Sequence, residues 1–247
     1  MSPGGCLLNP PTLDTMEGIG SVYAAGRGRI GDLVVSLDAE QAAIPVPACP
    51  AWTVHDVVAH VTGVCTDILS GNIEGVTTDP WTAAQVDARK DVPIAEVVAE
   101  WNEAAAQVEA FAENFPERVD EQWVADLTTH EHDIRGALGQ PGGRDTDALH
   151  VGLDFLVTMG LASSLSSRQL PGLRVTAGEK SWVVAGDDAG NEACDEVQAP
   201  AFELFRALTG RRSPTQIRGY AWTGAPDRYL PAFEYGPFTV RPTDLVE

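Results

Sequence analysis

Lysine is almost absent from this sequence, with Lys90 and Lys180 the only two among 247 residues. Sixteen basic residues stand against thirty-six acidic ones, which gives a formal net charge of −20 at pH 7. A protein with this charge repels phosphate groups instead of attracting them. The composition therefore argues against a nucleic-acid partner and against binding to an anionic membrane surface.

Cysteine is also scarce. The chain has four cysteines without a CxxC pair: Cys6, Cys49, Cys65 and Cys194. In a chain of this length, such scattered positions favour neither a disulfide framework nor a cysteine zinc cluster. We interpret Cys49 and Cys65, which flank His60, as packing residues.

Long apolar runs and targeting signals are missing from the sequence as well. No uninterrupted apolar run approaches ~20 residues, so no membrane span is expected. The N-terminal stretch lacks the charged region and the long apolar core of a signal peptide. Hydrophobic residues nevertheless make up 44% of the chain, enough for a globular core. These features predict a cytoplasmic protein with reduced thiols.

The first half of the chain has the pattern of a helical bundle. Residues 1–13 are rich in Pro and Gly and are expected to form a loose leader. Apolar residues then recur at helical spacing over 14–37, 53–69, 94–115 and 120–138. The run from Gly139 to Gly143 ends the last of these helices. Four long helices with no strand between them predict a bundle over residues 14–143.

The pattern changes after residue 143. We expect one more apolar helix over 145–167, short strands over 173–177 and 181–185, and a strand that leads into a helix over 197–208. The tail contains aromatic, β-prone stretches at 220–222 and 238–240. Residues 144–247 are therefore predicted to form a smaller α+β domain, which makes the whole chain α+β.

Asp126 and His130 have the spacing of half a metal site. They are four residues apart in a predicted helix, so both side chains leave the same face, one turn apart. A carboxylate and an imidazole in this arrangement commonly bind a metal ion together. His60, which lies among valines in another predicted helix, is the candidate third ligand. On this pattern alone, a three-residue metal site and a histidine–aspartate hydrogen bond in a polar core are equal alternatives.

The neighbouring polar residues have simpler interpretations. His132 and Glu131 are displaced from the face of His130, so we expect them to be solvated or to lie behind the ligands. His55 lies in the first turn of its helix and is expected to be exposed. His150 begins a later helix and is interpreted as structural.

Three separated motifs resemble the mycothiol-dependent maleylpyruvate isomerase family. The stretch VPACPAWTVHDVVAH, which ends at His60, resembles the second-helix signature of that family. The helix from Asp126 to Leu138 resembles its second signature, in which a carboxylate precedes a histidine by four residues. Residues 202–213, FELFRALTGRRS, resemble a stretch of its C-terminal domain. The resemblance extends from about Asp14 to the end of the chain.

This resemblance implies a DinB-like four-helix bundle with one metal ion, usually zinc, followed by a sterol-carrier-like domain. The family binds its metal through His, Glu and His, which correspond here to His60, Asp126 and His130. The sequence departs from the family twice: Asp126 replaces the usual glutamate, and His132 replaces a tryptophan. Aspartate is itself a competent ligand for zinc and for harder metals.

The resemblance also implies a reaction class. The open metal position would take a low-molecular-weight thiol, in this family mycothiol, whose thiolate attacks an electrophilic small molecule. The result would be thiol transfer or thiol-assisted isomerisation, and the altered residue at His132 favours transfer. Arg89, Arg211, Arg212 and His132 are candidate substrate contacts, although a solvated arginine is the simpler interpretation of the first three. The alternatives are a metal-dependent hydrolase and a non-enzymatic, metal-stabilised binding protein.

Overall fold

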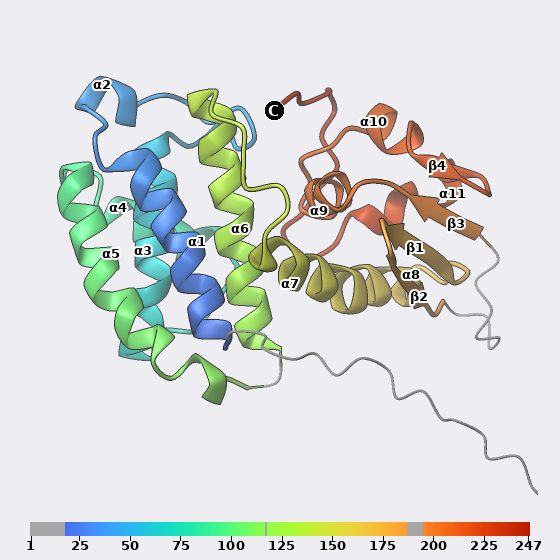
Figure 1. Cartoon of the computed structure of the whole chain (residues 1–247), viewed down its shortest axis with the longest axis horizontal. Coiled ribbons are helices and arrows are strands. Elements are labelled where there is room, and N and C mark those ends of the chain that lie inside the picture. Colours follow the sequence, from blue (N-terminus) through green and yellow to red (C-terminus); the bar gives the residue numbers. More distant parts are fainter. Residues whose placement is uncertain (1–17, 117, 187–194) are drawn as a thin grey trace, which may run out of the picture.

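The computed structural model describes residues 18–116, 118–186 and 195–247. The predicted leader over 1–13 and the expected beginning of the first helix at residue 14 lie outside these residues. Figure 1 shows the helical half on one side of the molecule and the mixed half on the other, with α7 leading from the first to the second. The α+β class predicted from the sequence is confirmed.

Four long helices make up the first half: α1 (Ile19–Val34), α3 (Val54–Ser70), α5 (Ile94–Glu109) and α6 (Val119–Leu138). Each of them packs against two of the other three. The helix α3 begins at a capping box, in which the side chains of Thr53 and Asp56 each accept a hydrogen bond from the other residue's backbone N–H. It ends at Gly71, whose φ of 73° is the left-handed conformation that glycine adopts without strain.

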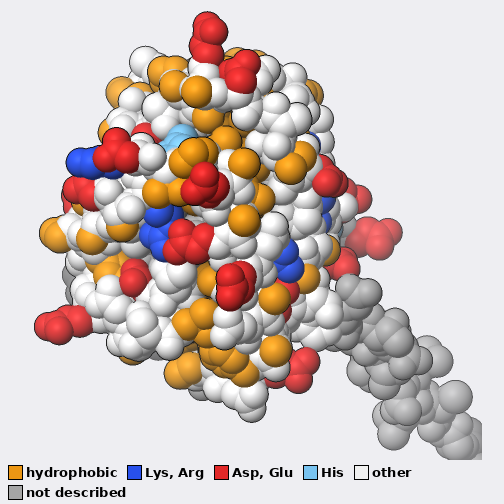
Figure 2. Space-filling model, turned by 90° about the vertical axis from the view of Figure 1, so that its left-hand side faces the viewer, with side chains coloured by type: hydrophobic (Ala, Val, Ile, Leu, Met, Phe, Trp, Pro, Cys, Tyr) orange, Lys and Arg blue, Asp and Glu red, His pale blue; other side chains and the backbone are white. Residues whose placement is uncertain are grey.

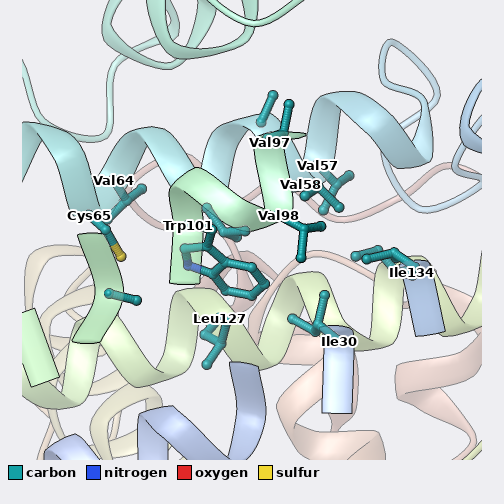
Figure 3. Packing of buried hydrophobic residues seen from close by; sticks show 14 of the residues in the cluster. Ile30, Val57, Val58, Val64, Cys65, Val97, Val98, Trp101, Leu127 and Ile134 are labelled. Atoms are coloured by element: carbon teal, nitrogen blue, oxygen red, sulfur yellow. The ribbon is translucent and has the colours of Figure 1, made fainter. Parts of the chain in front are cut away.

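The bundle core consists mainly of valine and alanine, with large aromatic side chains such as Trp101 among them (Figure 3). Trp101 of α5 is fully buried among residues of the neighbouring helices, including Val58 and Leu127. Residues with the 3.6-residue spacing detected in the sequence thus face inward, which is why that spacing predicts these helices. The core holds α3 and α6 side by side, so the segments that carry the candidate ligands face one another.

Short helices fill the connections within the bundle: α2 (Ala39–Ala42), α4 (Asp79–Asp87) and a 3₁₀ turn over Ala112–Asn114. The helix α4 lies between the segments 53–69 and 94–115, outside the helices that the apolar spacing predicts. This helix packs on α3 and contains one buried polar residue, Gln85. Its weak amphipathic pattern explains why the sequence did not predict its limits.

The second half begins with a continuous helix, made of α7 (Asp147–Phe155), a π-helical stretch (Leu156–Leu161) and α8 (Ala162–Ser167). By length and composition this helix could cross a membrane, because its mean hydropathy is 1.4. Because the prediction from the sequence considered only uninterrupted apolar runs, it did not identify this helix as a possible span. Half of the window is buried inside the protein. Buried core helices have the same length and composition, so the helix alone is weak evidence for a span.

A mixed sheet and several short helices complete the second half. The strands β1 (Leu173–Ala177), β2 (Lys180–Val184), β3 (Asp195–Gln198) and β4 (Ala221–Trp222) form a sheet in the order β2-β1-β3-β4. The β1–β3 pair is parallel, and the other two pairs are antiparallel. The remaining elements are α9 (Ala201–Leu208), α10 (Pro214–Arg218), α11 (Pro226–Tyr229) and a 3₁₀ turn (Leu230–Phe233).

Two sequence expectations need adjustment in this half. The strand expected within 197–208 begins at Asp195, before the predicted limit. The β-prone stretch over 238–240 forms no regular strand, and only Phe238 makes an isolated bridge, with Tyr235.

The hydrophobic core is divided into two clusters. The first extends from Val22 to Ala148, and the second from Leu149 to Phe233, so the division falls within α7. This helix packs on α6 of the bundle and on α9 of the second half. Because α7 contributes to both cores, a domain boundary between residues 143 and 144 stays a prediction.

Candidate metal site

His60, Asp126 and His130 converge between α3 and α6. Each offers one ligand atom, and the three atoms lie within 4.8 Å of one another. Oδ1 of Asp126 is 3.6 Å from Nε2 of His60 and 3.5 Å from Nε2 of His130. Two tetrahedral zinc ligands at bond lengths of about 2.0–2.1 Å lie about 3.4 Å apart. Asp126 therefore lies from each histidine at nearly the separation that one zinc ion requires.

Gln85 of α4 fixes the orientation of the His60 ring. Its amide nitrogen donates to Oδ2 of Asp67 at 2.6 Å, because an ionised carboxylate only accepts hydrogen bonds. Its carbonyl oxygen must then accept from Nδ1 of His60, 2.7 Å away. Nδ1 thus carries the proton, and Nε2 of the neutral ring keeps its lone pair for a ligand.

Gly63 makes room for this contact on α3. A Cβ atom at Gly63 would lie 2.5 Å from the Gln85 side chain, far inside van der Waals contact. The absent side chain therefore lets Gln85 lie against the helix and reach His60. Asp67 and Gln85 together resemble the outer hydrogen bonds that orient histidine ligands in metalloproteins.

Asp133 of α6 lies behind the second histidine. Its Oδ2 atom is 3.3 Å from Nδ1 of His130, although the angle does not make a regular hydrogen bond. The carboxylate is fully buried, and it is paired with Arg206 at 2.8 Å and Arg211 at 2.7 Å. A buried carboxylate on the far nitrogen of an imidazole is the usual support of a histidine metal ligand.

The charges of the cluster are strongly coupled. Burial opposes ionisation of Asp126, but the two adjacent imidazoles outweigh it and lower the pKa of this carboxyl below its usual range. Burial likewise disfavours protonation of His130, yet the Asp126 carboxylate outweighs it and raises the pKa of His130 to about 9. Without a metal ion, a proton on His130 thus supplies the positive charge that the site favours. A divalent cation would replace that proton.

Aromatic side chains wall the cluster on one side. The ring of Trp52 lies 5.1 Å from that of His60 and 5.8 Å from that of His130, and Trp81 meets His60 edge-on at 6.4 Å. The side chain of Asp126 is 35% exposed to solvent, whereas both histidines are buried. The site therefore has two buried nitrogen ligands and one carboxylate that solvent reaches.

A comparison with known protein families identifies the part of the chain that carries the candidate ligands. Residues 23–138 match the family model described as the mycothiol maleylpyruvate isomerase N-terminal domain. The helical half of this chain therefore contains a domain that matches that family model. The matched segment contains all three candidate ligands.

Solved structures extend the similarity beyond the isomerase-type N-terminal domain. A crystal structure of the mycothiol-dependent maleylpyruvate isomerase has a TM-score of 0.54 and 13% identity, and the match covers 83% of this chain and 91% of that one. A histidine-to-alanine mutant of the same enzyme matches with a TM-score of 0.53 and 12% identity, over the same shares. At these identities the similarity establishes the fold alone. No curated protein matches the sequence significantly.

The three candidate substrate arginines are all engaged in ion pairs. Arg89 is buried and holds Glu100 at 2.6 Å, and Arg211 is paired with Asp133. Arg212 is buried and is paired with Glu203 at 2.6 Å. The interpretation of these residues as solvated surface arginines is therefore wrong, because each supports packing within the isomerase-type fold. A role in binding substrate stays a prediction.

His132 faces away from the ligand cluster, as its position two residues from His130 predicted. Its ring meets Phe202 of α9 edge-on at 4.8 Å. Burial, followed by the charge of Arg206, lowers the pKa of His132 to about 3, so the ring is neutral. Its role as a substrate contact at the metal also stays a prediction.

Other polar residues differ from the sequence interpretation. Glu131 is fully buried, where it is paired with Arg29 at 2.7 Å and Arg135 at 3.0 Å, so it is not solvated. His55 is half-buried, with Nε2 2.7 Å from the Val92 carbonyl, and is not simply exposed. His150 is exposed and contacts Asp145.

Sequence reasoning missed Gln85, Asp133 and Trp52 as parts of the site. Asp133 is three residues after His130 on the same helix, and this spacing could have identified it. Trp52 lies in the motif that carries the family resemblance, but its side-chain direction is not visible in the sequence. Gln85 lies in a segment with weak periodicity, and nothing in the pattern marks it as buried.

Proposed function

We propose that this chain is a cytoplasmic metal-dependent enzyme that uses a low-molecular-weight thiol, mycothiol, to attack an electrophilic small molecule. Zn²⁺ is the proposed ion, and His60, Asp126 and His130 are its proposed ligands. The supporting observation is the convergence of these three side chains inside an isomerase-type N-terminal domain. Two imidazoles and one carboxylate suit zinc with an open coordination position, as in catalytic sites.

The chain's own residues would prepare the site for a thiol. A bound divalent ion would lower the pKa of the thiol, so that the thiolate is available at neutral pH. Gln85 holds the His60 ring with Nε2 toward the cluster, and Asp133 lies against the far nitrogen of His130. Trp52 covers both imidazoles and limits the approach of water from its side. The solvent-reachable side of Asp126 leaves access for the thiol.

We infer that the reaction is thiol transfer. In transfer, sulfur stays bonded to the electrophilic carbon, whereas in isomerisation the adduct rotates and releases the thiol. This inference is supported by His132, which replaces the family's tryptophan and faces Phe202 instead of the cluster. The tryptophan that the isomerase pattern has at this position is therefore missing, and His132 does not take its place beside the metal ligands.

Calorimetric titration with thiols tests this function. We expect zinc-loaded protein to bind mycothiol, and to bind S-methyl mycothiol at least about tenfold more weakly, because the methyl group blocks formation of a thiolate. The variant His60→Ala should lose thiol binding. The control His150→Ala should keep it, because His150 is exposed and lies outside the cluster. Equal binding of the free and methylated thiols would contradict the proposal. If the protein binds zinc but does not bind mycothiol, the result would support the alternative function, a metal-dependent hydrolase.

A further inference from the structure

Arg89 follows the end of α4, and its buried guanidinium contacts three helices of the bundle. Its Nε and Nη2 atoms donate to the two carboxylate oxygens of Glu100 on α5, at 2.9 and 2.6 Å. Nη2 also donates to Oγ1 of Thr66 on α3 at 3.0 Å. Nη1 donates to the main-chain carbonyl of Gln85 on α4 at 3.1 Å. One side chain thus joins the end of α4 to both neighbouring helices.

The bond to the Gln85 carbonyl closes the last turn of α4. The backbone N–H of Arg89 bonds the carbonyl of Val86, so the carbonyl of Gln85 is left for the guanidinium. The last carbonyls of a helix lack partners within the helix, and a cation beside them is favourable. Arg89 therefore holds the helix at the turn that carries Gln85.

The position of α4 depends on polar contacts because this helix buries little apolar surface. Gln85 is its one buried residue, and Trp81 is its one hydrophobic residue that packs against the bundle core. The side chain of Gln85 bonds Nδ1 of His60 at 2.7 Å and Oδ2 of Asp67 at 2.6 Å. A displacement of the end of α4 would lengthen the bond that orients the His60 ring.

The charge of Arg89 is already matched within the protein. Glu100 supplies the opposite charge, and each guanidinium nitrogen has a protein acceptor. On the side of the molecule where α4 and α5 lie, the few visible basic side chains are interspersed with acidic and apolar ones (Figure 2). These contacts favour a role of Arg89 in holding other residues over a role in binding an anionic ligand.

We propose that Arg89 is a positioning residue for His60. Together with Glu100 and Thr66 it holds the end of α4, so that the side chain of Gln85 reaches Nδ1 of His60 and keeps Nε2 directed at the cluster. The inference rests on the proposed metal site and extends it to a residue that contacts none of the three candidate ligands.

Zinc affinity in a double-mutant cycle tests the route of this effect. We expect Arg89→Met to bind zinc about tenfold more weakly than the wild type, as measured by competition with a chelator. In the Gln85→Ala background the same change should cost less than about twofold, because the contact through which Arg89 acts is already lost. Equal losses in the two backgrounds would overturn the proposal. The side chain of Glu100 is 42% exposed, so water solvates its carboxylate in the variant and folding should persist.

Two further variants separate positioning from a general effect on the bundle. Glu100→Gln keeps the guanidinium but removes its charged partner, so it should weaken zinc binding less than Arg89→Met does. The control Arg27→Met breaks a similar pair between α1 and α5, in which Arg27 holds Glu109 at 2.7 and 3.0 Å. This control should keep the wild-type zinc affinity. Equal affinities of Arg89→Met and Arg27→Met would also overturn the proposal.

The ring ¹⁵N signals of the histidines in metal-free protein give a readout that needs no zinc. Both Arg89→Met and Gln85→Ala should shift the signals of His60, whereas Arg27→Met should leave them unchanged. These shifts in a chain that binds no zinc would contradict the metal site and still support the positioning role. Stoichiometric zinc in the wild type, together with unchanged His60 signals in Arg89→Met, would contradict the positioning role alone.

Discussion

Asp133 of α6 and Arg206 of α9 form an ion pair of 2.8 Å in which neither side chain is exposed. The same carboxylate is paired with Arg211 and lies 3.3 Å from Nδ1 of His130. One buried group therefore contacts both the second half of the chain and a candidate metal ligand. This arrangement links the packing of the two halves to the orientation of the His130 ring.

Replacing Asp133 by alanine should strongly destabilise the protein. The change leaves buried guanidinium groups without their carboxylate, and removing one partner of a buried pair typically costs about 3–5 kcal/mol. The measurement is the free energy of unfolding of metal-free protein in urea. The matched control is Arg218→Ala, which breaks the exposed pair with Asp227 and should cost less than about 1 kcal/mol. Equal losses in the two variants would show that the Asp133 pairs contribute little.

Replacing Gln85 by alanine should weaken metal binding without abolishing it. The variant keeps all three candidate ligands but leaves Nδ1 of His60 without its hydrogen bond. Loss of such an outer contact typically lowers metal affinity about 10–100-fold. Competition with a chelator measures this affinity, and Gln107→Ala on the exposed side of α5 is the control. Unchanged affinity in the Gln85 variant would mean that the contact does not position the ring.

Acidification should destabilise the protein through His132. The pKa of this residue is about 3 in the folded protein and about 6.5 in an unfolded chain, so unfolding takes up a proton between these values. Its contribution to stability is complete above about pH 6.5 and is lost as the pH falls toward 3. Between pH 7 and about pH 5, the free energy of unfolding of metal-free wild-type protein should fall by about 2 kcal/mol more than that of His132→Gln, as measured by unfolding in urea. If the free energy of unfolding fell equally with pH in the wild type and in His132→Gln, the lowered pKa of His132 would be contradicted.

The two described cysteines should react slowly with alkylating agents. Burial raises the pKa of Cys49 to about 12 and that of Cys65 to about 11, so little thiolate exists at neutral pH. Compared with an ordinary thiol, alkylation by iodoacetamide should be about 1000-fold slower at Cys49 and about 100-fold slower at Cys65. The experiment uses a background in which Cys6 and Cys194 are replaced by serine, and the denatured protein is the control. Fast alkylation of the folded protein would show a reactive cysteine and reopen its role as a nucleophile.

The sequence predicted the bundle well because its signals are local. The capping box at Thr53 and the apolar spacing of α3, α5 and α6 act within a few residues of each other and give clear periodicity. The helix α4 was poorly predicted because it is short and weakly amphipathic. The strands were placed to within about two residues, except in the tail, where aromatic content did not produce a regular strand.

The candidate site could be predicted only in part. Spacing along α6 showed that Asp126 and His130 share a face, but the partnership with His60 depends on how two distant helices pack. From the sequence, His60 could be assigned as the third ligand only through the resemblance to a known family. The pairing of Arg211 with Asp133 joins residues 78 positions apart, so no local pattern could reveal it.

The central claim is that His60, Asp126 and His130 bind one divalent metal ion, and elemental analysis of the purified protein tests it most directly. We expect about one zinc ion per chain in the wild type and in the control His150→Ala, and loss of most of it in His60→Ala and Asp126→Ala. A folded wild-type protein that binds no stoichiometric metal when zinc is supplied, or variants that retain the wild-type amount, would contradict the account.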